Sequence, residues 1–482
     1  MLFNSLQFLI FFPIVVSVYF VLPHRFRWFF LLCSSYYFYM CWKPEYVVLI
    51  MISTIIDYYA GLQMWKTTLR AKRKKYLILS LVSNFCILFA FKYFNFFNES
   101  ARHIFNHFNI LYNIPAFKVL LPIGISFYTF QTLSYSIDVY RGHQKAEKHL
   151  GIFALYVAFF PQLVAGPIER SINLLPQFYE KHSFDYQRIK KGLLLMSWGF
   201  FKKLVIADHV AVLVDQVYNH PADYTGTSLI IATYFFAFQI YCDFSGYSDI
   251  AVGAAQVLGF DLMTNFNFPY MAKSVAEFWK RWHISLSTWF RDYLYIPLGG
   301  NRVTKNRWFF NIFAVFLLSG LWHGANWTFI IWGALHGSYL LFSIASSGWR
   351  NQAVSALKLN QYPRIHEAIK IFVTFHFVVF AWIFFRANSI KDAVYISTHL
   401  FTDMNFQKLE YALGLEPSEI IIAVMAILIM EIVQVMQRGT ALRVWISQRP
   451  LWLQCAVYYS VIFCLFIFKH SNMNTPFIYF QF

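Results

Sequence analysis

Two histidines, one in an apolar stretch and one in an amphipathic stretch, lie where an imidazole could act as a base. His323 is at the centre of residues 309–341, a segment that contains no Lys, Arg, Asp or Glu and is long enough to cross a bilayer. His283 lies within residues 276–295, among tryptophans that recur at helical spacing. Because an ionisable group at membrane depth is costly, we treat His323 as a candidate for function; His283 is a second candidate because it lies mid-stretch, where it could face inward.

Small residues surround His323. Gly320 and Gly324 have the Gly-x-x-x-Gly spacing, which predicts a helix face that a neighbouring backbone can approach closely. The same arrangement recurs at residues 333–337, around His336. We interpret His336 as a structural residue that donates a ring N–H to a carbonyl on the next helix, which is the usual role of a buried histidine. His323 is the stronger candidate for catalysis.

The composition indicates an integral membrane protein. The 482 residues are 58% hydrophobic and only 13% charged, with a mean hydropathy of +0.47, whereas about a quarter of the residues in a soluble protein are charged. The net charge of +17 comes mostly from loops between apolar stretches, which indicates topology rather than nucleic-acid binding. Six cysteines without a C-x-x-C pair indicate neither a disulfide framework nor a zinc site.

The apolar stretches predict the fold class: an all-α, polytopic membrane protein of about 11 to 13 transmembrane and re-entrant helices that enclose a tunnel. Polar, Pro and Gly residues break the segments 119–137 and 152–170, as expected of helices buried in protein. The basic run at 66–75 predicts a cytoplasmic loop and therefore a periplasmic N-terminus. We expect a last span at 451–468, an interfacial tail at 476–482, and one domain over residues 1–482.

Residues 276–295 predict a single amphipathic helix. Its tryptophans fall on one face, while Lys280, His283, Ser287 and Arg291 fall along another. In such a helix His283 lies mid-helix and could face inward together with Ser287. A covalent mechanism through this pair is the weaker interpretation, because no acid is placed to orient the imidazole. No H-x-x-H or H-E-x-x-H spacing occurs near either candidate histidine, so we expect no metal site.

Several motifs resemble the membrane-bound O-acyltransferases, and within that family the group that acetylates alginate or peptidoglycan. In chain order they are L-P-I-G-I-S-F at 121–127, V-A-G-P at 164–167, D-F-S-G-Y-S-D at 243–249, R-W-H-I-S-L-S-T-W at 281–289, D-Y-L-Y-I-P-L-G-G-N-R at 292–302 and L-W-H-G-A-N at 321–326. The resemblance extends over most of the chain. It maps the essential histidine of the family onto His323 and the second one onto His283.

The resemblance implies an O-acetyltransferase of the bacterial inner membrane. Such an enzyme moves an acetyl group from a cytoplasmic thioester, acetyl-CoA or another acyl donor, to a hydroxyl on the periplasmic side. The acceptor is a cell-surface polysaccharide such as an alginate-like exopolysaccharide or peptidoglycan, often by way of a periplasmic serine-hydrolase-like partner. No metal and no resident cofactor are implied.

The chemistry of acyl transfer assigns roles to these residues. Transfer from a thioester to a hydroxyl needs a base near the acceptor and stabilisation of the oxyanion. We expect His323 to deprotonate the hydroxyl and His283 to orient the donor or support His323. The candidate substrate-binding residues, including possible donors to the oxyanion, are Trp322, Asn326, Trp282 and Ser287.

Two alternatives remain at this stage. A transporter or flippase for lipid-linked sugars would also need broken helices and buried polar groups, and Asp57, Lys202 and Asp243 could line its route. Within acyl transfer, the alternative is a D-alanyl transferase of the teichoic-acid type.

Overall fold

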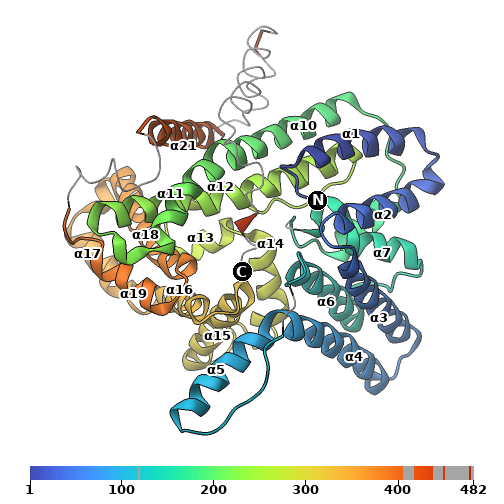
Figure 1. Cartoon of the computed structure of the whole chain (residues 1–482), viewed down its shortest axis with the longest axis horizontal. Helices are drawn as coiled ribbons and strands as arrows, with labels where there is room; N and C mark the ends of the chain where they lie inside the picture. The colour runs from blue at the N-terminus through green and yellow to red at the C-terminus, as the bar shows by residue number, and fades with distance from the viewer. Residues whose placement is uncertain (118–119, 165, 405–416, 438–448, 451–476, 479–482) are drawn as a thin grey trace. The chain divides into compact units, whose positions relative to one another are not determined.

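The computed structural model describes residues 1–117, 120–164, 166–404, 417–437, 449–450 and 477–478. Within these ranges the chain forms helices joined by loops and contains no β-strand, which confirms the all-α prediction (Figure 1). The helices form two compact units, residues 1–196 with 250–263, and residues 197–249 with 264–482. The predicted last span at 451–468 lies outside the described residues.

Six helical stretches in the described part of the chain are long and apolar enough to cross a membrane. They are Pro44–Lys66, Arg70–His107, Gly226–Leu258, Trp327–Ala345, Pro363–Arg386 and Ser418–Met436. A shorter apolar helix, Leu6–Val21, lies near the N-terminus. The protein is therefore a multi-pass membrane protein.

The first unit contains the N-terminal helices. They are α1 (Leu6–Val21), α2 (His24–Met40), α3 (Val47–Lys66), α4 (Arg70–Leu88), α5 (Phe94–His107), α6 (Ile125–Arg141), α7 (Leu150–Ala158), α8 (Phe160–Leu163) and α9 (Ser171–Leu174). A π-helical turn, Phe89–Tyr93, joins α4 to α5. Two further helices, α10 (Tyr186–Phe200) and α12 (Gly226–Leu258), contribute residues to both units.

A fully buried carboxyl group joins three helices of the first unit. Asp57 on α3 accepts hydrogen bonds from Ser80 Oγ at 2.5 Å and from Asn84 Nδ2 at 3.0 and 2.9 Å, both on α4. Ser136 Oγ on α6 lies 3.4 Å from the same carboxyl group. A polar side chain inside the membrane is tolerated when other helices satisfy it, so this cluster stabilises the packing of α3, α4 and α6.

The predicted interruption at 152–170 is confirmed. Helix α7 ends at Ala158, and the one-turn helix α8 follows with Pro161 in its first turn, all of it buried. The side-chain amides of Gln131 and Gln162 both donate to the Tyr156 carbonyl, at 2.6 and 2.7 Å. A break in a helix leaves backbone groups without helical partners, and lipid could not bond to them. Here side chains inside the protein do so.

The second unit carries both candidate histidines. Its helices are α11 (Asp208–Asn219), α13 (Val275–Arg281), α14 (Ile284–Phe290), α15 (Lys305–His323), α16 (Trp327–Ala345), α17 (Ser347–Ala356), α18 (Pro363–Arg386), α19 (Ile390–His399) and α21 (Pro417–Gln437). Two π-helical turns, η4 (Phe201–Ala207) and η7 (Arg291–Tyr295), continue α10 and α14.

Residues 309–341 form two helices instead of one continuous stretch. Helix α15 ends at His323, the chain turns at residues 324–326, and α16 packs back along α15. A Cβ atom on Gly320 would overlap the Phe329 carbonyl oxygen, and one on Gly333 would overlap the Phe316 carbonyl oxygen. The predicted close backbone approach is therefore confirmed at both glycines.

The predicted role of Gly324 is wrong in one respect. Gly324 follows the end of α15 with an extended backbone, so it does not share a helix face with Gly320. It lies beneath the Phe329 ring, which an added Cβ would strike. The side chain of Asn326 then caps α16 by accepting from Thr328 N at 3.1 Å, which begins the second helix.

Candidate active site

His323 is the last residue of α15 and is buried in an aromatic cage. Its ring centroid lies 4.9 Å from that of Trp322, 5.0 Å from that of Trp332 on α16 and 5.4 Å from that of Phe385 on α18. All three rings meet the imidazole in edge-on geometry. The cage holds the ring in place and keeps water away from it.

His283 lies between two helices rather than within one. The predicted continuous helix at 276–295 is wrong: α13 ends at Arg281, α14 begins at Ile284, and His283 has a left-handed backbone with φ 44°. Such a conformation is unusual for a residue with a side chain, and it is often found where function constrains the backbone. The break turns the imidazole into the interior, where it is fully buried.

Asn265 holds His283 in this position. Its Oδ1 accepts from Ser285 N at 3.1 Å and from Ser285 Oγ at 3.0 Å, and it lies 3.2 Å from His283 Nδ1. Its backbone carbonyl accepts from Ile284 N at 2.9 Å. Since Oδ1 accepts from a backbone N–H, it also accepts from His283, so Nδ1 carries the imidazole proton and Nε2 is the basic nitrogen.

The structure brings the two candidate histidines together. The ring centroids of His283 and His323 lie 6.4 Å apart, and Trp322 touches both rings, at 6.0 Å from His283 and 4.9 Å from His323. The two imidazoles are far apart in the sequence but share one interior site.

The other candidate residues are placed less directly. Trp282 is fully buried, and its ring stacks on Phe278 at 5.4 Å. Asn326 is committed to the helix cap and also donates from Nδ2 to the Asn388 carbonyl at 3.1 Å. The Ser287 hydroxyl donates to the Trp282 carbonyl at 3.2 Å, and Ser287 N donates to the His283 carbonyl at 3.0 Å. Ser287 thus bonds to the backbone of this turn, and its hydroxyl does not form the inward-facing pair with the His283 ring that a continuous helix predicts.

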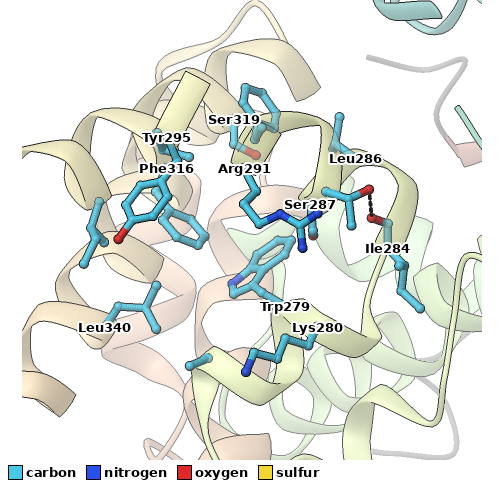
Figure 2. A pocket seen from close by; sticks show the side chains of 15 residues that line it. Trp279, Lys280, Ile284, Leu286, Ser287, Arg291, Tyr295, Phe316, Ser319 and Leu340 are labelled. Carbon is cyan, nitrogen blue, oxygen red and sulfur yellow. Dashed lines mark hydrogen bonds between the residues drawn. The ribbon is translucent and has the colours of Figure 1, made fainter. Parts of the chain in front are cut away.

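Figure 2 shows a pocket formed by the same helices, which neither candidate histidine lines. It has a volume of about 510 Å³ and is lined by residues of α13, α14, η7, α15 and α16. Trp279, Phe316 and Leu340 contribute apolar walls, while Lys280 and Arg291 contribute exposed cations. Two of its lining residues, Ile284 and Ser319, lie one residue after His283 and one helical turn before His323.

The family model for the membrane-bound O-acyltransferases matches residues 31–387. The chain belongs to this family. It is 42% identical to a probable alginate O-acetylase of Pseudomonas aeruginosa, over 82% of this chain and 73% of the relative. It is 36% identical to a peptidoglycan O-acetyltransferase of Helicobacter pylori, over 76% and 72% of the two chains. A teichoic acid D-alanyltransferase of Bacillus subtilis is 29% identical over 57% of this chain and 71% of the relative.

Family membership gives the activity class of this O-acyltransferase and excludes the transporter interpretation. The residues proposed for a transport route are also paired. Lys203 Nζ binds Asp208 Oδ1 at 2.8 Å and Asp243 Oδ1 at 2.7 Å, and Lys202 Nζ binds Asp249 Oδ2 at 2.8 Å. These ion pairs join η4, α11 and α12, so the charges of the O-acyltransferase compensate one another, as buried charges require.

Two tail residues of the O-acyltransferase pack near His283. Ile478 N donates to Asp243 Oδ2 at 2.7 Å, and the Phe477 ring lies 5.5 Å from that of Phe244. Phe244 in turn meets the His283 ring edge-on at 4.6 Å. Phe477 and Ile478 are buried, so the prediction of an interfacial tail is wrong for these two residues.

Burial controls the charge of His283. It lies outside the six candidate spans, and desolvation lowers its pKa to about 3. The imidazole of this O-acyltransferase is therefore neutral at physiological pH. A neutral ring whose Nδ1–H is held by Asn265 presents a lone pair on Nε2, as a general base or hydrogen-bond acceptor requires.

Sequence reasoning did not identify Asn265, which fixes the imidazole of His283. It lies in the loop between α12 and α13, and no motif near it indicates a catalytic role. Among the described residues no group of three or more His, Cys, Asp or Glu side chains could hold a metal ion.

Proposed function

We propose that this O-acyltransferase transfers an acetyl group from a cytoplasmic thioester, acetyl-CoA or another acyl thioester, to a hydroxyl of a cell-surface polysaccharide. The observation that carries the proposal is the buried His283–His323 pair, with ring centroids 6.4 Å apart, in a member of this family. The names of the relatives, an alginate O-acetylase and a peptidoglycan O-acetyltransferase, support acetyl as the acyl group.

His323 acts as the base in this proposal. A ring nitrogen of His323 takes the proton of the acceptor hydroxyl as its oxygen attacks the thioester carbonyl. The C–O bond forms, the C–S bond breaks, and the thiolate leaves and takes the proton back from the imidazolium. His323 ends α15, and a cation is favoured at a helix C-terminus, so its position stabilises the charged intermediate.

His283 assists as a neutral group. Two imidazoles this close cannot both carry a charge at low cost, and Asn265 holds His283 as a fixed neutral tautomer. Its Nε2 is therefore an acceptor that orients a hydroxyl or a protonated His323. The roles of Trp322, Trp282, Asn326 and Ser287 as substrate-binding residues stay predictions, and Ser287 has support because it lines the pocket.

The pocket supports the donor assignment. Its volume of about 510 Å³ is within the range typical of small-molecule sites. Apolar walls with two cations, Lys280 and Arg291, suit an elongated thioester arm that carries an anionic group. We expect no resident metal or cofactor to take part, so the donor itself supplies the acyl group.

The topology proposed for this chemistry places the N-terminus outside. The basic residues that begin α4, with Arg70, Lys72, Lys74 and Lys75 exposed, mark the cytoplasmic side. The membrane is then the bacterial inner membrane, the acceptor is periplasmic, and a separate periplasmic serine-hydrolase-like acetyltransferase is a partner. Labelling of single cysteines placed at residues 2 and 74 with a membrane-impermeant reagent tests this orientation.

Acetylation of the surface polysaccharide tests the function. A deletion strain is complemented with wild type, His323→Ala or His283→Asn, at equal membrane abundance, and polymer O-acetyl content is measured. Asparagine tolerates the left-handed backbone at 283, so this variant removes the imidazole without straining the chain. We expect no acetylation with His323→Ala and a strong reduction with His283→Asn. Full acetylation by an abundant His323→Ala protein would show that His323 only packs.

D-alanyl transfer has weaker support than acetylation. The D-alanyltransferase of Bacillus subtilis is less similar to this chain and aligns with less of it than the two acetylating relatives. Release of D-alanine rather than acetate from the isolated polymer after mild base would favour that alternative.

A further inference from the structure

A third buried histidine, His336 on α16, bonds to a pocket wall. The indole N–H of Trp279 donates to His336 Nδ1 at 3.2 Å, and both side chains are buried. The predicted bond from His336 to a carbonyl is therefore wrong: His336 is the acceptor, and its partner is a side chain of α13. A neutral imidazole that accepts at Nδ1 carries its proton on Nε2.

Three other rings packed around His336 offer the Trp279 indole no hydrogen-bond acceptor. Phe278 and Phe316 stack on the imidazole, each at 6.3 Å, and Trp332 meets it edge-on at 5.0 Å. Loss of the acceptor would leave the Trp279 N–H buried and unpaired, which favours a different indole orientation in which the N–H finds another partner. The orientation of Trp279 thus depends on His336.

Trp279 separates His336 from the pocket. Its ring lies 5.4 Å from that of Phe316, and both side chains line the cavity together with Leu340 on α16. Figure 2 shows the indole in the middle of the lining, between Lys280 and Arg291. A rotated or shortened residue 279 would change the width of the pocket next to the two cations.

We propose that His336 is a positioning residue that holds Trp279 as a pocket wall, and that the pair determines which acyl donors fit. This proposal rests on the proposed function, because it assigns the pocket to the thioester donor. His336 itself lies behind the indole and is not among the pocket-lining residues, so its effect on the donor passes through Trp279.

Steady-state kinetics with purified protein in lipid nanodiscs tests the pair. The variants are Trp279→Phe, His336→Phe, the double variant and His336→Asn, whose Oδ1 can replace Nδ1 as the acceptor. With the cell's surface polysaccharide present as the acyl acceptor, thiol release from acetyl-, propionyl- and butyryl-CoA gives kcat and KM for each donor. His376→Phe is the matched control, because it removes a ring hydrogen bond, 2.6 Å to Tyr234, that does not involve the pocket.

We expect Trp279→Phe and His336→Phe each to raise the KM for acetyl-CoA about tenfold with little change in kcat. Relative to wild type, each variant should also shift the preference from acetyl-CoA towards butyryl-CoA by about tenfold, because one or two methylenes in an apolar pocket have an effect of this size. The double variant should match Trp279→Phe, and His336→Asn should restore most of the wild-type KM.

Other results would overturn the proposal. These are a change in kcat alone, additive effects in the double variant, or an equal change in His376→Phe. If Trp279→Phe or His336→Phe proves unstable by thermal unfolding, the donor preference of a stable His336→Asn protein decides: the wild-type preference supports the proposal, and a shift towards butyryl-CoA overturns it. If the wild type releases no thiol from any donor, the proposed function fails first, and the role of the pair in donor selection fails with it.

Discussion

Gly320→Ala should disturb the close packing of α15 against α16. The added Cβ would overlap the Phe329 carbonyl oxygen and lie 3.4 Å from Gly333 Cα, and neither backbone atom can rotate away. Overpacking of a tight interior costs about 1–3 kcal/mol. Gly348→Ala on α17 is the matched control, because no atom lies within 4 Å of its added Cβ. Both substitutions gain helix propensity, so their free energies of unfolding should differ by the steric cost, about 1–3 kcal/mol.

Thermal unfolding in detergent, followed by tryptophan fluorescence, measures this difference. We expect Gly320→Ala to unfold several degrees below Gly348→Ala, since about 1 kcal/mol shifts the midpoint of a large domain by about 2–4 °C. Acyl transfer should fall more in Gly320→Ala, because His323 lies in the next helical turn of α15. Equal unfolding temperatures and equal activities would show that the two helices do not pack through Gly320.

Three further predictions concern the groups around His283. Asn265→Ala removes the acceptor of the His283 proton and should lower kcat about 100-fold, as loss of general acid–base assistance does; an unchanged kcat would contradict the assigned tautomer. Lys203→Met leaves Asp208 and Asp243 as buried charges without their cation and should lower the free energy of unfolding by about 3–5 kcal/mol, which is measured as a loss of membrane abundance. Adding Asp243→Asn in the same chain should restore the abundance. The depressed pKa of His283, about 3, means that the unfolded chain binds a proton first; between about pH 6.5 and pH 3 the free energy of unfolding should therefore fall more steeply in wild type than in His283→Asn, by about 1.4 kcal/mol per pH unit.

The sequence predicts the fold class, and it singles out two histidines whose rings the structure places 6.4 Å apart; their catalytic role stays a prediction. Apolar length alone indicates membrane helices, and the small residues at 320 and 333 indicate a close helix contact that the structure contains. The histidines follow from the cost of burying an ionisable group, a property of each residue and its immediate neighbours. These predictions need only local information.

The missed features depend on contacts between distant residues. Residues 276–295 have uninterrupted helical periodicity, and the break at His283 is specified by Asn265, which bonds to Ile284 and Ser285 from another loop. The turn after His323 depends similarly on Asn326 and its bond to Asn388. Periodicity cannot reveal a helix end that a remote side chain imposes.

The geometry also distinguishes the two histidines more clearly than sequence motifs do. Burial disfavours positive charge on both imidazoles, but the C-terminal end of α15 offsets part of that cost at His323, whereas His283 precedes the N-terminus of α14 and has a fixed proton on Nδ1. If a proton moves during acyl transfer, it therefore moves to His323, and His283 contributes a lone pair. His283→Gln should then retain part of the activity, because an amide oxygen can replace an acceptor nitrogen, whereas His323→Gln should retain none, because an amide cannot take up a proton at neutral pH. Equal loss in both variants, measured as acetyl transfer at equal abundance, would contradict this division of roles.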